Sequence, residues 1–202
     1  MIISGNSHPQ LAASLAASLN LPVAAVDISK FPNGEKRVWV KSTLAGLPAI
    51  VVQSFCEPVD ENIIEFCLLL DAVHHLGASR IIGVVPWFGY SPQDKLFRLG
   101  EPISSHVIAR LIGSLHLDRL LVVDVHSPQV LRHFSVPITE VSALPLFIDQ
   151  LKSQSLNNYV VVALDLGAIP RATQFARALN LPVIQFNKTR DRDTGVISFT
   201  SL

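Results

Sequence analysis

The sequence predicts an α/β fold built on a parallel, doubly wound sheet. Short apolar runs of strand length alternate with helix-length segments along the 202 residues, which is the pattern of successive βαβ units. One run, residues 120–123, is uniformly apolar, as expected for a strand buried on both faces of a parallel sheet. With 49% hydrophobic residues, the chain is long enough for one large domain or one and a half small ones.

The first half of the chain is expected to begin with strands around a short helix. An Ala- and Leu-rich helix is predicted over residues 8–19, with Ser7 or Asn6 as its cap. The pair Asn33-Gly34 favours a tight turn. The strands expected around them are residues 2–6, 23–26, 38–40 and 49–55.

A long helix is predicted over residues 60–76. Its polar positions form only a narrow stripe, namely Glu61, Glu65, Ala72 and His75. Such a helix is buried on most sides, so we expect it to contact its own sheet and a second subunit as well.

The second half continues the alternation. Proline suits a first helical turn, so Pro102 is expected to open a helix that runs to residue 115. Residues 136–141 are interpreted as a connector. The remaining elements expected are strands over residues 80–87, 120–123, 160–165, 182–186 and 196–199, and helices over residues 143–151 and from Pro170 to 179.

Two domains are expected, a complete one over residues 1–141 and an incomplete one over residues 142–202. The second has only two or three strands, and no helix follows the apolar strand at residues 196–199 to cover its sheet. An exposed hydrophobic sheet edge is unfavourable. We therefore expect a C-terminally shortened version of a longer, two-unit protein.

Composition excludes several classes of function. Sixteen basic and sixteen acidic residues give a formal net charge of zero, so neither a nucleic-acid footprint nor a membrane surface is indicated. No apolar run is long enough for a membrane span, and Cys56 and Cys67 form no disulfide framework, which favours a cytoplasmic protein. No G-x-G-x-x-G opens the first helix, so a dinucleotide-dependent oxidoreductase is not favoured.

The pair Asp124 and His126 follows the apolar run at residues 120–123. Because strand side chains alternate, residues two apart are expected to emerge on the same side, here at the carboxyl end where open α/β sheets bind ligands. A carboxylate beside an imidazole could hold a metal–phosphate or move a proton. The alternative is a capping Asp with a His bonded to backbone.

Five segments, read together, resemble one family. They are Phe31-Pro-Asn-Gly-Glu35, Pro86-Trp-Phe-Gly-Tyr-Ser-Pro-Gln-Asp94, Glu101-Pro-Ile-Ser104, Val123-Asp-Val-His-Ser-Pro-Gln129 and Lys188-Thr-Arg190. Their order and approximate spacing are similar to those of ribose-phosphate pyrophosphokinases. The resemblance implies a type I phosphoribosyltransferase fold and assembly as a homo-oligomer, in this family a hexamer. It also implies transfer of the diphosphoryl group of ATP, with Mg2+, to ribose 5-phosphate.

The resemblance implies an ATP site formed by two loops. The family's Phe-Pro-Asp-Gly-Glu loop holds the adenine, often across a subunit boundary, and corresponds to Phe31, Asn33 and Glu35. The family's Arg-Gln-Asp contacts the ATP phosphates and corresponds to Pro92, Gln93 and Asp94, so the arginine is absent here. Proline offers no donor, and Lys95 or Arg98 is a candidate to replace it.

The resemblance also implies the remaining site residues. Asp124 and His126 match the family's Asp-Leu-His, which positions Mg-ATP, and Lys188 and Arg190 match a Lys-x-Arg that would neutralise the transferring group. The alternative for residues 188–192 is a solvated charged turn. Asp165 matches a Pro-Asp-x-Gly-Gly loop and is expected to meet a ribose hydroxyl or a metal.

Two hypotheses follow from this resemblance. The chain is either a shortened ribose-phosphate diphosphokinase or a non-catalytic relative that acts as a structural or regulatory subunit. The retained pairs Asp124/His126 and Lys188/Arg190 favour the first. Pro92, Asn33 and the absence of the family's ribose-5-phosphate loop after Arg192 favour the second.

Overall fold

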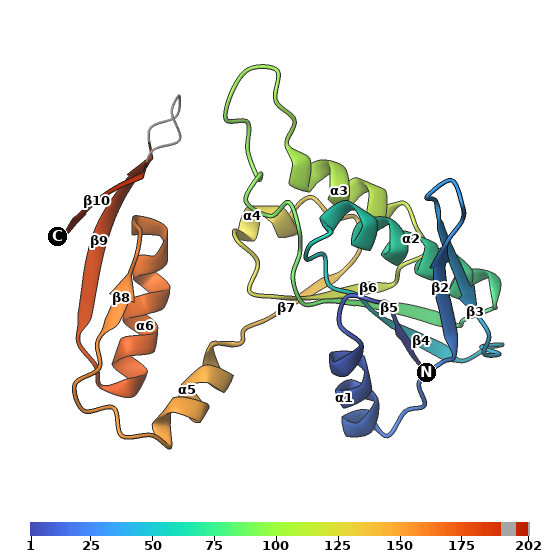
Figure 1. Cartoon of the computed structure of the whole chain (residues 1–202), viewed down its shortest axis with the longest axis horizontal. Helices are drawn as coiled ribbons and strands as arrows, with labels where there is room; N and C mark the ends of the chain where they lie inside the picture. The colour runs from blue at the N-terminus through green and yellow to red at the C-terminus, as the bar shows by residue number, and fades with distance from the viewer. Residues whose placement is uncertain (191–196, 202) are drawn as a thin grey trace. The chain divides into compact units, whose positions relative to one another are not determined.

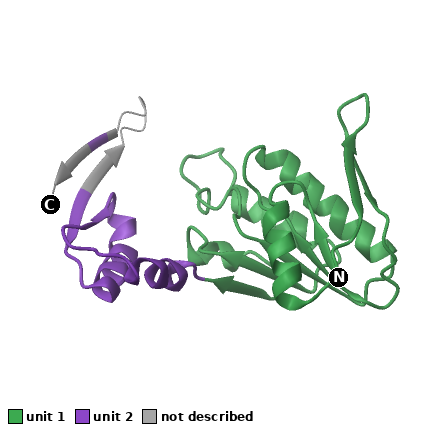
Figure 2. Ribbon diagram, turned by 60° about the horizontal axis from the view of Figure 1, so that its bottom comes forward, with its two compact units in different colours: residues 1–141 green, residues 142–202 purple. Residues whose placement is uncertain are grey.

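The structure of the chain, a computed structural model, divides into two compact units, Met1–Val141 and Ser142–Leu202 (Figure 2). It describes the backbone of residues 1–190 and 197–201, and the side chains of residues 1–186 and 198. Within these residues, no helix is long and apolar enough to cross a membrane. Each unit is described by itself.

Unit 1 is organised around a five-stranded parallel sheet of order β1-β4-β5-β6-β7. Its strands pair in parallel throughout, with registers such as Ile3 opposite Val51 and Val84 opposite Leu121. The parallel arrangement predicted for this part of the chain is therefore confirmed. The strands are β1 (Ile2–Ser4), β4 (Pro48–Val52), β5 (Arg80–Val85), β6 (Arg119–Val123) and β7 (Ile138–Val141).

Strand β7 corrects the interpretation of residues 136–141 as a connector. Its residues Ile138, Thr139 and Glu140 pair with β6 at the edge of the sheet. An edge strand has one neighbour and is only partly covered, so polar residues such as Thr139 and Glu140 are tolerated there. The apolar pattern that identified the central strands is consequently weak in β7.

Helices cover both faces of the unit 1 sheet, as Figure 1 shows. Helix α1 (Pro9–Leu19) packs Ala12 and Ala16 against Ile2 and Val52 on one face. Helix α2 (Val59–His75) packs on the other face, where Phe66 and Leu69 belong to the larger core. Figure 1 also shows α3 (Ser104–Gly113) on that side, and the short α4 (Pro128–Leu131) follows β6. The doubly wound arrangement is therefore confirmed.

The cap of α1 differs from the prediction. His8 is the N-cap residue, and its Nδ1 accepts a long hydrogen bond of 3.4 Å from the backbone N–H of Leu11. Ser7 and Asn6, the expected caps, contact Gln53, directly after β4, and Glu65 of α2 instead, as described below. Helix α1 is capped at its C-terminus by Asn20, which adopts the left-handed conformation common at helix ends (φ 52°).

An antiparallel hairpin, β2 (Val26–Lys30) and β3 (Lys36–Val40), lies between α1 and β4 in the chain. The turn predicted at Asn33-Gly34 is confirmed: Gly34 has φ +90°, and its N–H donates to the carbonyl of Phe31 at 2.9 Å. The strand expected over residues 23–26 is wrong. Val23 makes only an isolated bridge to Ile2, and the regular pairing starts at Val26 because its partner is the following strand.

Unit 2 contains a three-stranded sheet of order β10-β9-β8. Strand β8 (Val161–Ala163) pairs in parallel with β9 (Val183–Arg190), whereas β10 (Ile197–Ser201) is antiparallel to β9, so this sheet is mixed. The helical segments are α5 (Leu144–Lys152), the 3-10 turn η1 (Leu166–Ala168) and α6 (Ile169–Leu179).

Candidate functional site

The candidate site lies at the carboxyl edge of the unit 1 sheet. Because β1, β4, β5 and β6 are parallel, the segments that follow them leave the sheet at one edge, where α/β folds bind ligands. These segments begin at Gly5, Gln53, Pro86 and Asp124. The arrangement brings polar residues from four separate parts of the sequence to this edge.

A buried polar network underlies this edge. The side chain of Gln53 is fully buried; its Oε1 accepts from the Ser7 hydroxyl at 2.7 Å, and its Nε2 donates to Glu65 Oε1 at 2.9 Å. Glu65 is also fully buried, and the same oxygen accepts from the backbone N–H of Asn6 at 2.6 Å. Asn62 accepts from Gln53 Nε2 at 3.2 Å. The network therefore ties the end of β1 to β4 and α2.

The buried position of Glu65 corrects the prediction of a polar stripe on α2. Glu65 was expected on that stripe with Glu61, but its carboxylate has no exposed area and pairs with Lys36 Nζ at 2.5 Å. A carboxylate is rarely buried without a partner, and Lys36, on β3, supplies one. Glu61 lies one turn earlier and remains accessible, and its hydrogen bond from Lys30 holds its pKa below the usual value.

A shallow hollow of about 480 Å³ opens beside the first turn of α2. Its lining includes Asp60 and Glu61 from α2, and Tyr90 and Gln93 from the loop after β5. The Tyr90 hydroxyl donates to Asp60 Oδ1 at 2.6 Å, and this bond raises the pKa of Tyr90. Tyr90 has φ +65°, a left-handed conformation uncommon for a side chain of this size. The hollow is open to solvent, and four of its lining residues have polar side chains.

Gln93 and Asp94, two predicted ATP-binding residues, lie in the loop between β5 and α3. Gln93 lines the hollow, and its Oε1 accepts from the Ser104 hydroxyl at 2.5 Å, which ties the loop to the start of α3. Asp94 is half-buried, and Pro92 is exposed. Gln93 therefore lines the hollow, and its side-chain oxygen already accepts a hydrogen bond from Ser104.

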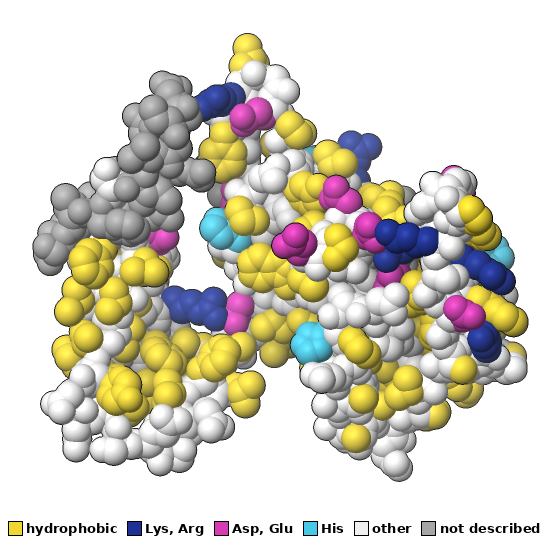
Figure 3. All heavy atoms as spheres, viewed as in Figure 1, with side chains coloured by type: hydrophobic (Ala, Val, Ile, Leu, Met, Phe, Trp, Pro, Cys, Tyr) yellow, Lys and Arg dark blue, Asp and Glu magenta, His cyan; other side chains and the backbone are white. Residues whose placement is uncertain are grey.

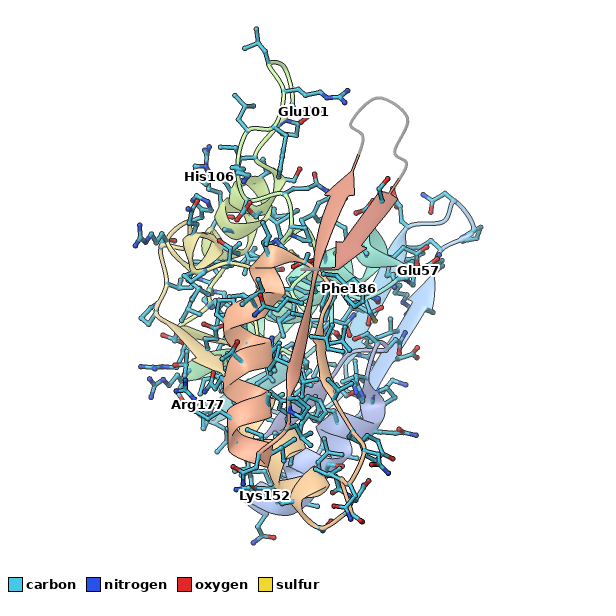
Figure 4. The ribbon with its side chains drawn as sticks, turned by 90° about the vertical axis from the view of Figure 1, so that its left-hand side faces the viewer. Glu57, Glu101, His106, Lys152, Arg177 and Phe186 are labelled. Atoms are coloured by element: carbon cyan, nitrogen blue, oxygen red, sulfur yellow. The ribbon has the colours of Figure 1, made fainter. Side chains whose placement is uncertain are left out.

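The candidates for replacing the missing arginine, Lys95 and Arg98, lie further along the same loop. Both are exposed, and Lys95 Nζ lies 5.3 Å from the ring centroid of Phe97. The backbone N–H of Arg98 donates to Glu101 Oε2 at 3.1 Å. Figure 4 shows Glu101 in the loop that rises beyond α3, with His106 lower on that helix. These two cations therefore belong to a projecting part of unit 1.

Asp124 and His126 follow β6, but the strand ends at Val123, before either of them. Asp124 has φ +43° and is half-buried, whereas His126 is exposed. The next N–H, that of Val125, donates to Glu140 Oε1 at 3.0 Å. The strand alternation on which the expectation rested therefore does not extend to these two residues, since β6 ends before them and the left-handed Asp124 turns the chain. Both residues still belong to the segment that leaves the carboxyl edge.

The predicted adenine loop lies elsewhere on unit 1. Phe31, Asn33 and Glu35 are exposed in the hairpin turn, where Asn33 Oδ1 accepts from the N–H of Glu35 at 3.2 Å. Figure 1 shows the tip of this hairpin and α4, which follows β6, on opposite sides of the unit. The structure therefore does not bring these three residues together with Asp124 within unit 1.

Three predicted residues lie in unit 2. Asp165 is half-buried and caps η1, because its Oδ1 accepts from the N–H of Ala168 at 2.9 Å. Lys188 and Arg190 lie on β9, but their side chains are outside the described residues. Asp165 therefore stands at the start of a helical segment, after a strand that ends at Ala163 and not at Asp165 as predicted.

The network and the hollow include functional candidates that the sequence did not reveal, namely Gln53, Asp60, Tyr90 and Lys36. One signal was available: Gln53 is a polar residue that directly continues the apolar strand Pro48–Val52. A polar residue at that point needs a buried partner or a ligand. No pattern along the chain identified Lys36 as the ion-pair partner of Glu65, because Lys36 comes from the hairpin.

A doubly wound parallel sheet with polar loops at its carboxyl edge places the chain in the α/β class, whose open sheets bind ligands at this edge. Within that class, residues 1–115 match the family model for the N-terminal domain of ribose phosphate pyrophosphokinase. The match covers more than half of the chain, and the chain therefore belongs to the ribose-phosphate pyrophosphokinase family.

Individual relatives extend the similarity to nearly the whole chain. The ribose-phosphate pyrophosphokinase of Clostridium perfringens is 34% identical over 95% of this chain and 61% of its own length. That of Marinomonas sp. is 32% identical over 98% of this chain and 64% of its own. The crystal structure of phosphoribosylpyrophosphate synthetase from Mycobacterium smegmatis matches with a TM-score of 0.87 at 30% identity, over 99% of this chain and 66% of that chain. The chain thus spans about three fifths of the curated relatives it matches, and the fold predicted for it is confirmed.

Proposed function

We propose that unit 1 binds Mg-ATP at the carboxyl edge of its sheet, as the ATP-binding part of a ribose-phosphate diphosphokinase. The observation that carries the proposal is the placement of Gln93, Asp94 and Asp124. They lie in the loops that follow β5 and β6, which are neighbours in the sheet, in a chain of this family. Such an enzyme transfers the β,γ-diphosphoryl group of ATP to the anomeric hydroxyl of ribose 5-phosphate, giving phosphoribosyl pyrophosphate for nucleotide synthesis.

The residues divide into groups with different proposed roles. Phe31 would stack on the adenine and Glu35 would accept from its amino group, in the site of a second copy of the chain, because the hairpin tip and α4 lie apart in one unit. Lys188 and Arg190 would neutralise charge on the transferring group. Asp165 would meet the ribose. We propose a homo-oligomer in which the exposed hairpin loop of one copy completes the site of another.

The described residues fit Mg2+ brought by a nucleotide better than a resident metal. Among residues 1–186 and 198, no three His, Cys, Asp or Glu side chains are grouped to hold a metal ion. Mg2+ usually takes one or two carboxylates with the substrate phosphates, and the half-buried Asp124 can supply one, with His126 two residues further along the chain. Bound there, Mg2+ would neutralise phosphate charge.

Calorimetric titration with Mg-ATP tests the proposal directly. We expect micromolar binding by the chain and its loss in Asp124→Ala/His126→Ala, because the carboxylate and imidazole position the metal–nucleotide. The matched control is Asp71→Ala/His75→Ala, which removes an exposed Asp–His pair, 3.4 Å apart, from the last turns of α2. Binding that is absent in the wild-type chain, or retained in the first variant, would contradict the proposal.

A second candidate function is a non-catalytic subunit that assembles with complete relatives. Pro92 favours it, because the family has an arginine there and proline offers no donor to a phosphate. Incubation with Mg-ATP and ribose 5-phosphate separates the two candidates. Release of AMP identifies the enzyme, whereas nucleotide binding without AMP, together with co-assembly with a complete relative in native mass spectrometry, identifies the subunit.

Pro92→Arg is expected to tighten Mg-ATP binding. Pro92 is exposed in the loop that carries Gln93, so an arginine side chain has room to reach the phosphates without displacing core residues. One new hydrogen bond to a charged group contributes about 1.5–3 kcal/mol, which corresponds to roughly tenfold or more in the dissociation constant. Titration of both proteins measures the effect, with Pro92→Gln as the uncharged control. Equal affinities for the arginine variant and wild type would show that the loop does not face the phosphates.

A further inference from the structure

Two lysines flank the predicted adenine loop, and both are held by helix α2. Lys30 and Lys36 are cross-strand partners and are the last paired residues before the turn. Lys30 Nζ lies 2.8 Å from Glu61, and Lys36 Nζ lies 3.6 Å from Glu61 and 2.5 Å from Glu65. We call these four residues the hairpin clasp. Figure 3 shows acidic and basic side chains side by side on this face of unit 1.

The clasp is built to fix a position rather than to add surface charge. Two lysines opposite one another in a hairpin repel, and the carboxylate of Glu61 between them offsets the repulsion. The Lys36 side chain is only 11% exposed and Glu65 is fully buried, whereas Lys30 and Glu61 are 50% and 42% exposed. A buried charge that loses its partner is costly, so Lys36 has little freedom to leave Glu65.

The same end of α2 also holds the second predicted ATP loop. Asp60 accepts from the Tyr90 hydroxyl, and the carbonyl of Tyr90 accepts from the N–H of Gln93 at 3.0 Å. The first two turns of α2 therefore contact both the hairpin, through Glu61 and Glu65, and the loop that carries Gln93. Movement of the hairpin relative to α2 would change the position of the loop Phe31–Glu35 relative to the loop that carries Gln93.

From this geometry we infer that Lys36 is a positioning residue, which sets how the loop Phe31–Glu35 is presented to an adenine base. Lys36 directly follows Glu35, so its attachment to the buried Glu65 fixes the end of the loop. The inference rests on the proposed function. It does not give Lys36 any contact with the nucleotide, and it predicts that base recognition depends on Lys36 while phosphate recognition does not.

Hydrogen exchange and titration of Lys36→Met test the inference. In the wild-type chain the N–H groups of Phe31 and Gly34 donate within the turn, at 2.8 and 2.9 Å. In Lys36→Met we expect these two amides to exchange at least tenfold faster, while those of α1 are unchanged. We expect the dissociation constant of Mg-ATP to rise about tenfold, and that of Mg-triphosphate, which has no base, to stay the same. Lys36→Arg should restore both properties.

Two further variants separate positioning from damage to the fold. Lys41→Met is the matched control: Lys41 follows the end of β3, pairs at 3.2 Å with the exposed Asp27, and should affect neither measurement. Lys36→Met/Glu65→Gln removes both charges, so no carboxylate is left buried alone, and it should reproduce the effects of Lys36→Met in a folded chain.

The outcomes decide the inference separately from the proposed function. Unchanged exchange at Phe31 and Gly34 in Lys36→Met would overturn the clasp, whatever the chain binds. Equal weakening of Mg-ATP and Mg-triphosphate would overturn the specific role in base recognition. If the wild-type chain binds no Mg-ATP, the proposed function and the role in base recognition both fail, and the exchange data still decide whether Lys36 positions the loop.

Discussion

Glu65→Ala is expected to destabilise unit 1 by about 3–5 kcal/mol, because it removes one partner of a buried ion pair. The substitution leaves Lys36 Nζ without its carboxylate, and it removes the acceptor of Gln53 Nε2 and of the backbone N–H of Asn6. Typical domains have a total stability of only about 5–15 kcal/mol, so a large share is at risk. Urea unfolding followed by circular dichroism measures the change.

Two variants of α2 show whether burial is the cause. Asp71→Ala removes an acidic residue from the same helix, but Asp71 is 54% exposed, and we expect a far smaller loss. Glu65→Gln keeps an oxygen acceptor for Asn6 and Gln53 and should fall between the two. If Glu65→Ala unfolds at the same urea concentration as Asp71→Ala, the buried network does not stabilise unit 1.

The apolar strands could be predicted from the sequence because consecutive apolar residues are by themselves the signal of a strand buried on both faces. Strands β4, β5 and β6 are apolar except for the arginines that open β5 and β6, and the structure places them at the centre of the sheet. Strand β7 could not be recognised in this way, since its assignment depends on pairing with β6 rather than on its own composition. The strand predicted over residues 23–26 was misplaced for the same reason: β2 begins at Val26, because its register is set by β3.

The candidate site was predicted only as a set of loops. Motif order placed Gln93, Asp94, Asp124 and His126 near one another, and the parallel sheet accounts for the nearness of their segments. The sequence did not show that Asp124 adopts a left-handed conformation, because non-glycine residues with positive φ are uncommon and depend on local contacts.

The buried network could not be predicted because each member depends on another from a distant segment. Glu65 is 29 residues from Lys36, and Gln53 is 46 residues from Ser7. On a helical wheel Glu65 belongs with the exposed Glu61, and only the packing of the hairpin against α2 separates the two in burial. Polar residues in cores are stable only in such satisfied groups, so their positions follow from the assembled fold.

Gly5→Ala is the second substitution from which we expect a large loss of stability. A Cβ atom at Gly5 would lie 2.1 Å from Gln53 Oε1 and 2.6 Å from Gln53 Cδ, closer than carbon atoms can approach. Gln53 cannot move aside easily, because Ser7, Asn62 and Glu65 hold both ends of its amide. Overpacking costs about 1–3 kcal/mol, and breaking buried hydrogen bonds adds about 1–3 kcal/mol.

A second glycine distinguishes this steric effect from a backbone effect. At Gly34 a Cβ would meet no atom within 4 Å, but the residue has φ +90°, so Gly34→Ala should cost only about 1–2 kcal/mol. Urea unfolding of both variants should therefore rank Gly5→Ala as the more destabilising. The substitution Gln53→Ala removes the amide that the new methyl group would strike. Gly5→Ala should therefore cost far less stability when it is added to Gln53→Ala than when it is added to the wild-type chain. Equal effects of the two single substitutions would show that Gln53 is not fixed, and that the end of β1 is free to adjust.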